Sequence, residues 1–159
     1  MADNHELAVE RILDAPIDAV WRAVTEHLEQ WWCPKPWTTE LVEMDLRPGG
    51  RFCAIMRGPA GEGGEPMEGI LLDVVPERRL VFTNILDSHF DPQNSPVANI
   101  VGRFEFAPEG HKTRYRASAR HWDAESARKH DEMGFTQGWS AVADQLEAVA
   151  QGLAEKADA

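Results

Sequence analysis

Residues 135–153 read FTQGWSAVADQLEAVAQGL, and this stretch decides the fold. Its large apolar side chains recur at alternating steps of four and three residues, so they share one face of an α-helix. These side chains are Phe135, Trp139, Val142, Leu146, Val149 and Leu153. We predict that the helix starts near Asp123 and extends for about 30 residues, or about 45 Å. Its apolar face must be buried against another layer of the protein.

Upstream of this helix, residues 38–121 alternate short apolar runs with turn sequences, which is the pattern of strands joined by hairpins. The predicted strands are residues 41–46, 51–56, 67–75, 80–86, 97–106 and 113–121. We expect the glycine-rich residues 58–64 to form a mobile hairpin tip that does not pack, and residues 89–96 to form a polar loop.

The N-terminal residues supply one more strand and the first helices. Residues 7–13 alternate as a strand does, and Pro16 suits the first turn of a short helix that ends near Glu26. Residues 27–31 are predicted to add a second helical turn. This order of elements predicts a single α+β domain over residues 1–159. A curved antiparallel sheet of about six to seven strands wraps around the long C-terminal helix in this prediction.

The charge and the composition exclude several classes of function. The 16 lysine and arginine residues and 27 aspartate and glutamate residues give the chain a net charge of −11. Such a chain repels phosphate backbones and anionic lipids, which argues against nucleic-acid partners. No apolar run is long enough to insert into a membrane, and residues 1–6 lack the features of a signal peptide. We expect a soluble, cytoplasmic protein.

The sequence also lacks the common motifs of metal and cofactor sites. Cys33 and Cys53 are the only cysteines and form no CxxC motif, so neither a disulfide framework nor a zinc site is indicated. There is no HExxH motif, no Walker motif and no dinucleotide-binding glycine pattern. We expect no metal and no cofactor.

A tryptophan-rich loop precedes the first hairpin. Residues 31–37 read WWCPKPW, and the two prolines forbid regular structure. Trp31, Trp32 and Trp37 either form the mouth of a pocket against the last helix or close one end of the sheet. Exposed indoles are unfavourable, so we expect at least one of them to contact a ligand space.

The last predicted strand has one face of small residues. Tyr115, Ala117, Ala119 and His121 share a face that we expect to point inward, because the opposite face carries arginines. The two alanines either let the helix approach closely or leave room for a ligand. With residues chosen from the tryptophan loop, the sheet and the helix, the predicted pocket comprises Trp31, Trp32, Trp37, Phe82, Tyr115, Ala117, Ala119, His121, Met133, Phe135 and Trp139.

Two glycines and two histidines lie near the start of the helix. Gly134 and Gly138 interrupt the helical pattern, and we favour close packing on the sheet over room for a ligand or a bend. His121 and His130 are the candidate catalytic residues, because an imidazole can exchange protons near neutral pH. A buried histidine is more often a hydrogen-bonded core residue, and the spacing of this pair is wrong for a helical metal site.

Several motifs, taken together and in order, resemble the activator-of-Hsp90-ATPase-like family. They are residues 11–16 with Val20-Trp21, residues 45–50, residues 69–72 with Val75-Pro76, residues 80–83, and Gly138-Trp139. The resemblance covers residues 7–153. It implies the helix-grip fold of the START-like (SRPBCC, polyketide cyclase-like) superfamily, with a cavity between the helix and the sheet.

The resemblance leaves the function open. It implies the binding of lipids or hormones, or the chemistry of cyclases and aromatases, and the family name implies a chaperone partner and a stress response. The chaperone activators are two-domain proteins whose C-terminal domain alone is similar to this chain. Because of the tryptophan loop and the alanine face, we favour a non-catalytic protein that binds a small apolar or aromatic ligand. The alternatives are a cyclase, dehydratase or hydrolase that uses His121 or His130, and a chaperone-interacting module. A homodimer through the sheet edges stays undecided.

Overall fold

One antiparallel sheet forms the frame of the protein in a computed structural model that describes residues 5–95 and 98–158. Within these residues the sheet has seven strands in the order β1-β7-β6-β5-β4-β3-β2. The strands are β1 (Glu6–Leu13), β2 (Thr38–Met44), β3 (Arg51–Arg57), β4 (Gly63–Val75), β5 (Arg79–Thr83), β6 (Val101–Glu109) and β7 (Lys112–Arg120). The helices are α1 (Ile17–Glu26), α2 (Leu28–Trp31), α3 (Ala124–Glu132) and α4 (Phe135–Asp158). The predicted α+β class is confirmed, and the pairs β2–β3, β4–β5 and β6–β7 form hairpins as predicted.

The ends of two predicted strands differ from the structure. The strand predicted over residues 80–86 ends at Thr83. There the side chain of Asn84 takes over backbone pairing: its Nδ2 donates to Ala98 O at 2.7 Å, and its Oδ1 accepts from Ile100 N at 3.0 Å. The start predicted for the next strand, Val97, lies outside the described residues, and β6 begins at Val101.

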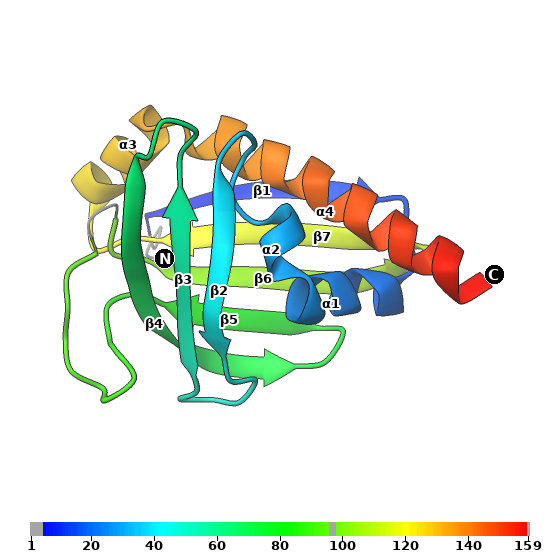
Figure 1. The fold of residues 1–159 in the computed structure, drawn as a ribbon, viewed down its shortest axis with the longest axis horizontal. Coiled ribbons are helices and arrows are strands. Elements are labelled where there is room, and N and C mark those ends of the chain that lie inside the picture. Colours follow the sequence, from blue (N-terminus) through cyan, green and yellow to red (C-terminus); the bar gives the residue numbers. More distant parts are fainter. Residues whose placement is uncertain (1–4, 96–97, 159) are drawn as a thin grey trace.

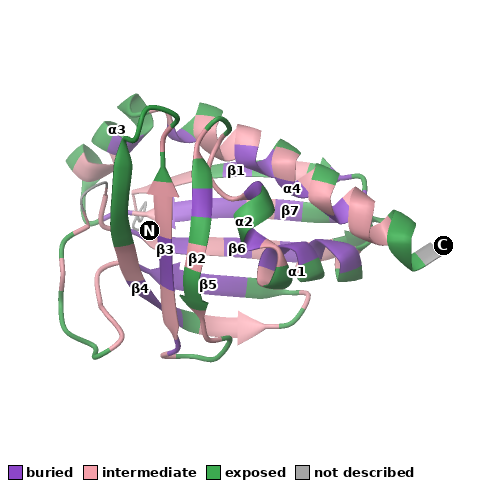
Figure 2. Cartoon of the chain, viewed as in Figure 1, coloured by how far each residue is buried: buried purple, intermediate pink, exposed green. Residues whose placement is uncertain are grey.

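The sheet is strongly curved, and β2, β3 and the first part of β4 run across the direction of the other strands (Figure 1). Register shifts mark the pairs β2–β3, β3–β4 and β4–β5, the region in which the sheet turns. Such bulges bend a strand and increase its twist. The curvature creates a concave side, which α1, α2 and α4 cover, and buried residues line the strands behind these helices (Figure 2).

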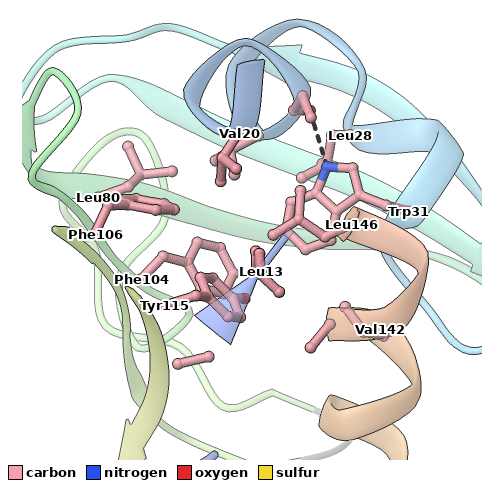
Figure 3. Close-up of a cluster of buried hydrophobic side chains, with 14 of the residues drawn as sticks. Leu13, Val20, Leu28, Trp31, Leu80, Phe104, Phe106, Tyr115, Val142 and Leu146 are labelled. Carbon is pink, nitrogen blue, oxygen red and sulfur yellow. Dashed lines mark hydrogen bonds between the residues drawn. The ribbon is translucent and has the colours of Figure 1, made fainter. Parts of the chain in front are cut away.

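The main core lies between α1, α2, α4 and strands β1, β5, β6 and β7 (Figure 3). Phe104 of β6 is its centre, with ring centroids 5.6 Å from Trp31 and 6.2 Å from Tyr115. Trp31 is fully buried, and its Nε1 donates to Ala23 O at 2.9 Å. This hydrogen bond satisfies the one polar atom that burial of the indole would otherwise leave without a partner.

The two faces of β7 behave as the alternation of its residues predicted. Tyr115, Ala117 and Ala119 are buried. On the opposite face, Arg114 pairs with Glu10 at 3.0 Å and Arg120 pairs with Glu6 at 3.1 Å. The arginines therefore meet acidic neighbours on adjacent strands rather than the core.

The single long helix predicted from Asp123 is wrong, because the helix breaks at Gly134. Asp123 does begin a helix: its side chain accepts a hydrogen bond from Ser126 N as the N-cap of α3. Gly134 then adopts a φ of +99°, which favours glycine, and α4 starts at the next residue. A Cβ at Gly134 would meet only Gln137 Oε1, at 3.9 Å, so the favoured explanation of close packing is also wrong there.

Part of the predicted glycine-rich tip belongs to a strand. Gly63 and Gly64 belong to β4, and Gly58 N donates to Glu62 O at 2.8 Å. A Cβ at Gly63 would lie 3.2 Å from Cζ3 of Trp37 and 2.4 Å from Met56 O. The missing side chain lets Trp37 pack on this segment, so the expectation that the tip does not pack is wrong.

Gly134 and Gly138 should respond to alanine in opposite ways. We expect Gly134→Ala to lower the free energy of unfolding by about 1 kcal/mol, because the positive φ is unfavourable for any residue with a Cβ. Gly138→Ala should be neutral or stabilise by up to about 1 kcal/mol, because alanine is the better helix former. Its Cβ would make an ordinary contact 3.6 Å from Pro34 Cγ. Urea denaturation of the two variants checks this, and an equal loss in both would contradict the assignment of Gly134 as the helix break.

Candidate functional site

A cavity of about 210 Å³ lies between the sheet and the N-terminal part of α4. Strands β3, β4 and β5 form one side, and α4, the tryptophan loop and His130 of α3 form the other. Its lining residues are Trp32, Cys33, Pro34, Phe52, Ala54, Met56, Met67, Glu68, Gly69, Phe82, Thr83, Asn84, Ala98, Ile100, His130, Gly138, Trp139 and Val142. Apolar side chains dominate this set, as in most small-molecule sites.

Aromatic rings form two opposite walls of the cavity. On the helix side, Trp32 and Trp139 meet edge to face with centroids 5.6 Å apart. On the sheet side, Phe52 and Phe82 meet in the same way at 5.5 Å. Edge-to-face pairs of this kind hold rings in defined orientations. The walls are therefore built from side chains that brace one another.

Gly102 sets the position of Phe82. A Cβ at residue 102 would lie 2.2 Å from Cζ of the Phe82 ring, so the ring rests directly on the backbone of β6. Any larger residue at this position would push the ring away. Sequence reasoning did not single out Gly102, because a glycine inside a strand has no unique meaning until its neighbour across the sheet is known.

The tryptophan loop is held against α4 by one side chain. Nε2 of Gln145 donates to the backbone oxygens of Trp31 and Cys33, at 2.8 and 3.0 Å, and its Oε1 accepts from Lys35 N at 3.0 Å. These contacts fix the loop, in which the two neighbouring indoles take different positions while their rings meet edge to face, with centroids 5.6 Å apart. Trp31 enters the core, and Trp32 faces the cavity.

Most polar groups in the cavity wall already have partners in the protein. Oγ1 of Thr83 donates to Ile100 O at 2.8 Å, and both amide atoms of Asn84 bond to the backbone. Glu68 pairs with Arg51, which lowers the pKa of this carboxyl group. Burial raises the pKa of the Cys33 thiol, so it stays protonated at neutral pH. Hydrogen bonds and an ion pair within the protein thus satisfy most polar side chains of the wall.

His121 and His130 form a hydrogen-bonded pair at the end of the cavity. His121 Nδ1 lies 2.7 Å from His5 O, and His121 Nε2 lies 2.8 Å from His130 Nδ1. The His130 ring packs against Phe135, with centroids 5.1 Å apart. Burial, with the nearby His121, lowers the pKa of His130 to about 4, so its imidazole is neutral at pH 7.

The structure brings together only some of the predicted pocket residues. Trp32, Phe82 and Trp139 line the cavity, as does His130. Phe135 and His121 stand behind His130 and contact its ring. The other predicted residues lie elsewhere: Trp31, Tyr115, Ala117 and Ala119 in the core, Trp37 over the glycine-rich segment, and Met133 on the surface.

The physical reason for these differences lies in the packing around Phe104. Its ring stacks on Tyr115 and occupies the space in front of the small face of β7. The alanines of that face therefore serve close packing rather than a void. Met133 is 61% exposed because the helix break at the next residue turns it away from the cavity.

Several cavity residues were missed from the sequence. Phe52, Ala54 and Met56 line the cavity from β3, and Met67 and Gly69 line it from β4. Their spacing of two residues was a usable signal, since alternate residues of a strand share a face. Two further observations concern only the described residues: none of their helices is long and apolar enough to cross a membrane, and no three histidine, cysteine or acidic side chains cluster as metal ligands.

Comparison with known proteins identifies relatives of the chain. Protein NE0264 from Nitrosomonas europaea has a similar structure, with 36% sequence identity, 99% of each chain covered and a TM-score of 0.88. Protein Ms6760 from Mycobacterium smegmatis is 26% identical over 92% of this chain and 91% of that chain, with a TM-score of 0.76. An AHSA1-like protein from Aeromonas hydrophila shares the fold, with 20% identity, 93% of each chain covered and a TM-score of 0.68.

No curated protein matches the chain. The family model described as "Activator of Hsp90 ATPase homolog 1-like protein" matches residues 14–151, which is most of the chain. The curved sheet around a long C-terminal helix agrees with the helix-grip fold that the sequence motifs implied. The chain therefore belongs to the family of activator of Hsp90 ATPase homolog 1-like proteins.

Proposed function

We propose that the protein binds a small apolar or aromatic molecule in the cavity between the sheet and α4. The observation that carries this proposal is a cavity of about 210 Å³ whose walls include four aromatic rings. An apolar cavity of about 150 Å³ is large enough for benzene. The present cavity is larger, so a two-ring aromatic compound is a suitable size for a first ligand.

The chemistry of the wall supports binding rather than turnover. A general base works best when its pKa is close to the working pH, whereas the pKa of His130 is lowered to about 4. Cys33 is the one thiol in the wall, and its raised pKa disfavours the reactive thiolate. An enzyme that uses His121 or His130 is therefore the weaker alternative. The chaperone-partner alternative is supported by the family name and by no contact of the described residues.

Ligand binding can be tested with a panel of one-ring and two-ring aromatic compounds. We expect binders to stabilise the protein by about 2.7 kcal/mol at a hundredfold excess over Kd, measured by thermal unfolding. Tryptophan emission should change with the same concentration dependence. Trp139→Ala should weaken binding by about tenfold or more, because it removes one of the two indoles of the helix-side wall. Trp122→Ala is the matched control, since Trp122 is 67% exposed and does not line the cavity.

A second variant tests the same cavity in case Trp139→Ala does not fold. Ala54 lines the cavity from β3, and Ala54→Phe should fill the space from the sheet side and abolish binding. Circular dichroism establishes that the variant is folded. If no compound of the panel binds the wild type, or if Ala54→Phe binds as well as the wild type, the proposed cavity is not the binding site.

The low pKa of His130 predicts a pH dependence of stability. The unfolded chain takes up a proton on this imidazole near pH 6.5, whereas the folded chain does so only near pH 4. The contribution of His130 to the free energy of unfolding is therefore fully present above pH 6.5 and is lost as the pH decreases towards 4. Asp131 beside it on α3 acts in the opposite direction and is the weaker influence.

Between pH 7 and pH 5, we expect the wild type to lose roughly 2 kcal/mol more unfolding free energy than His130→Phe. Urea denaturation at the two pH values measures this difference. His111→Phe, at an exposed turn residue, is the control and should keep the pH dependence of the wild type. An identical pH dependence in the wild type and His130→Phe would mean that His130 is not held neutral by the fold.

A further inference from the structure

The histidine pair is anchored at one end by a backbone carbonyl. His121 Nδ1 lies 2.7 Å from His5 O. A carbonyl oxygen can only accept a hydrogen bond, so Nδ1 of His121 must carry the proton. In the neutral imidazole the other nitrogen, Nε2, is then an acceptor. The backbone of residue 5 therefore selects the tautomer of His121.

The tautomer of His121 in turn determines the tautomer of His130. His121 Nε2 lies 2.8 Å from His130 Nδ1, and because His121 Nε2 accepts, His130 Nδ1 must donate. His130 is neutral at pH 7, so its Nε2 carries a lone pair and no proton. The opposite tautomer of His130 would place two lone pairs against each other at this distance. One carbonyl thus determines the hydrogen-bonding character of an atom two rings away.

The Nε2 atom of His130 has no hydrogen-bond partner among the described residues. The side chain is nevertheless buried, with 8% of the residue exposed, and it lines the cavity. The charged or titratable groups around it are His121 at the end of β7 and Asp131 on α3, whereas α4 presents Phe135 and Trp139. Nε2 keeps contact with solvent, since it is not among the fully buried side-chain atoms of the described residues that lack a partner. A ligand that excludes this solvent leaves a buried acceptor without a partner, which is unfavourable, unless the ligand donates a hydrogen bond to Nε2.

Other polar side chains in the wall already have partners within the protein. Thr83 and Asn84 bond to the backbone, and Glu68 pairs with Arg51. The thiol of Cys33 is a weak partner in either role. Among the wall side chains that the structure describes, His130 therefore offers through Nε2 a strong acceptor that has no hydrogen bond to the protein. An anionic carboxylate would meet the lone pair of His130 with its own lone pairs and would lose its hydration as well.

We propose that the His121–His130 pair makes the cavity selective for apolar ligands that carry one neutral hydrogen-bond donor, such as a phenol, an alcohol or an aromatic N–H group. The donor binds Nε2 of His130, and His121 acts as a positioning residue that holds the required tautomer. This inference rests on the proposed function, since it names the class of ligand for the same cavity.

The test compares three two-ring probes of similar size: 2-naphthol, 2-fluoronaphthalene and 2-naphthoate. Affinities are measured by tryptophan fluorescence and calorimetry at pH 7. We expect 2-naphthol to bind about tenfold more tightly than 2-fluoronaphthalene, the gain from one hydrogen bond to a buried acceptor. The carboxylate, 2-naphthoate, should bind more weakly than both.

Three variants assign this preference to the pair. His130→Phe keeps an aromatic ring and removes the acceptor, so the ratio of the two affinities should fall to about one. His121→Phe should reduce the ratio, because His130 is then free to adopt either tautomer. His111→Phe, remote from the cavity, should keep the wild-type ratio.

A spectroscopic measurement checks the tautomers without any variant. Imidazole nitrogen-15 spectra of the wild type should show Nδ1–H at both His121 and His130, and 2-naphthol should shift the Nε2 signal of His130. An Nε2–H tautomer at His130 overturns the inference, as do equal affinities for 2-naphthol and 2-fluoronaphthalene. Equal affinities would still support an apolar binding site, whereas no binding of any probe would overturn the proposed function as well.

Discussion

The close packing of α4 from Ala143 onwards determines where the cavity can lie. Ala143 and Ala150 in this part of α4 are fully buried, and their small side chains let α4 approach its neighbours α1, α2 and β1. Towards its N-terminus the helix carries Trp139, and an indole needs far more room than a methyl group. The helix therefore packs tightly at one end, and at the other end it stands over β3, β4 and β5 with the cavity between them.

The break at Gly134 completes this arrangement. In one continuous straight helix, His130 would lie further along the helix axis, away from the side chains of α4. The break lets α3 turn back, so that the His130 ring contacts Phe135 and Trp139 and meets His121 at the end of β7. A conformational property of one residue thus assembles the polar end of the cavity from three segments of the chain.

The sequence predicted those features that depend on a regular repeat. The apolar stripe of α4 and the inward face of β7 follow from periods of 3.6 and 2 residues, and both are confirmed. Features that depend on contacts between distant residues were not accessible. The different positions of Trp31 and Trp32 follow from the hydrogen bonds of Gln145, more than 110 residues away, and no local pattern in the tryptophan loop contains that information. His121 and His130 were recognised singly, but their hydrogen bond depends on a helix break that the apolar periodicity concealed.

The contact between Gly102 and Phe82 has a consequence for how this protein family can diversify. Residue 102 does not line the cavity, yet it determines how far the Phe82 ring can withdraw from it. A relative with alanine at this position would have to place the ring elsewhere and would enclose a differently shaped space. The shape of the cavity can therefore change during evolution through a backbone position behind the wall, while every residue that lines the cavity stays the same.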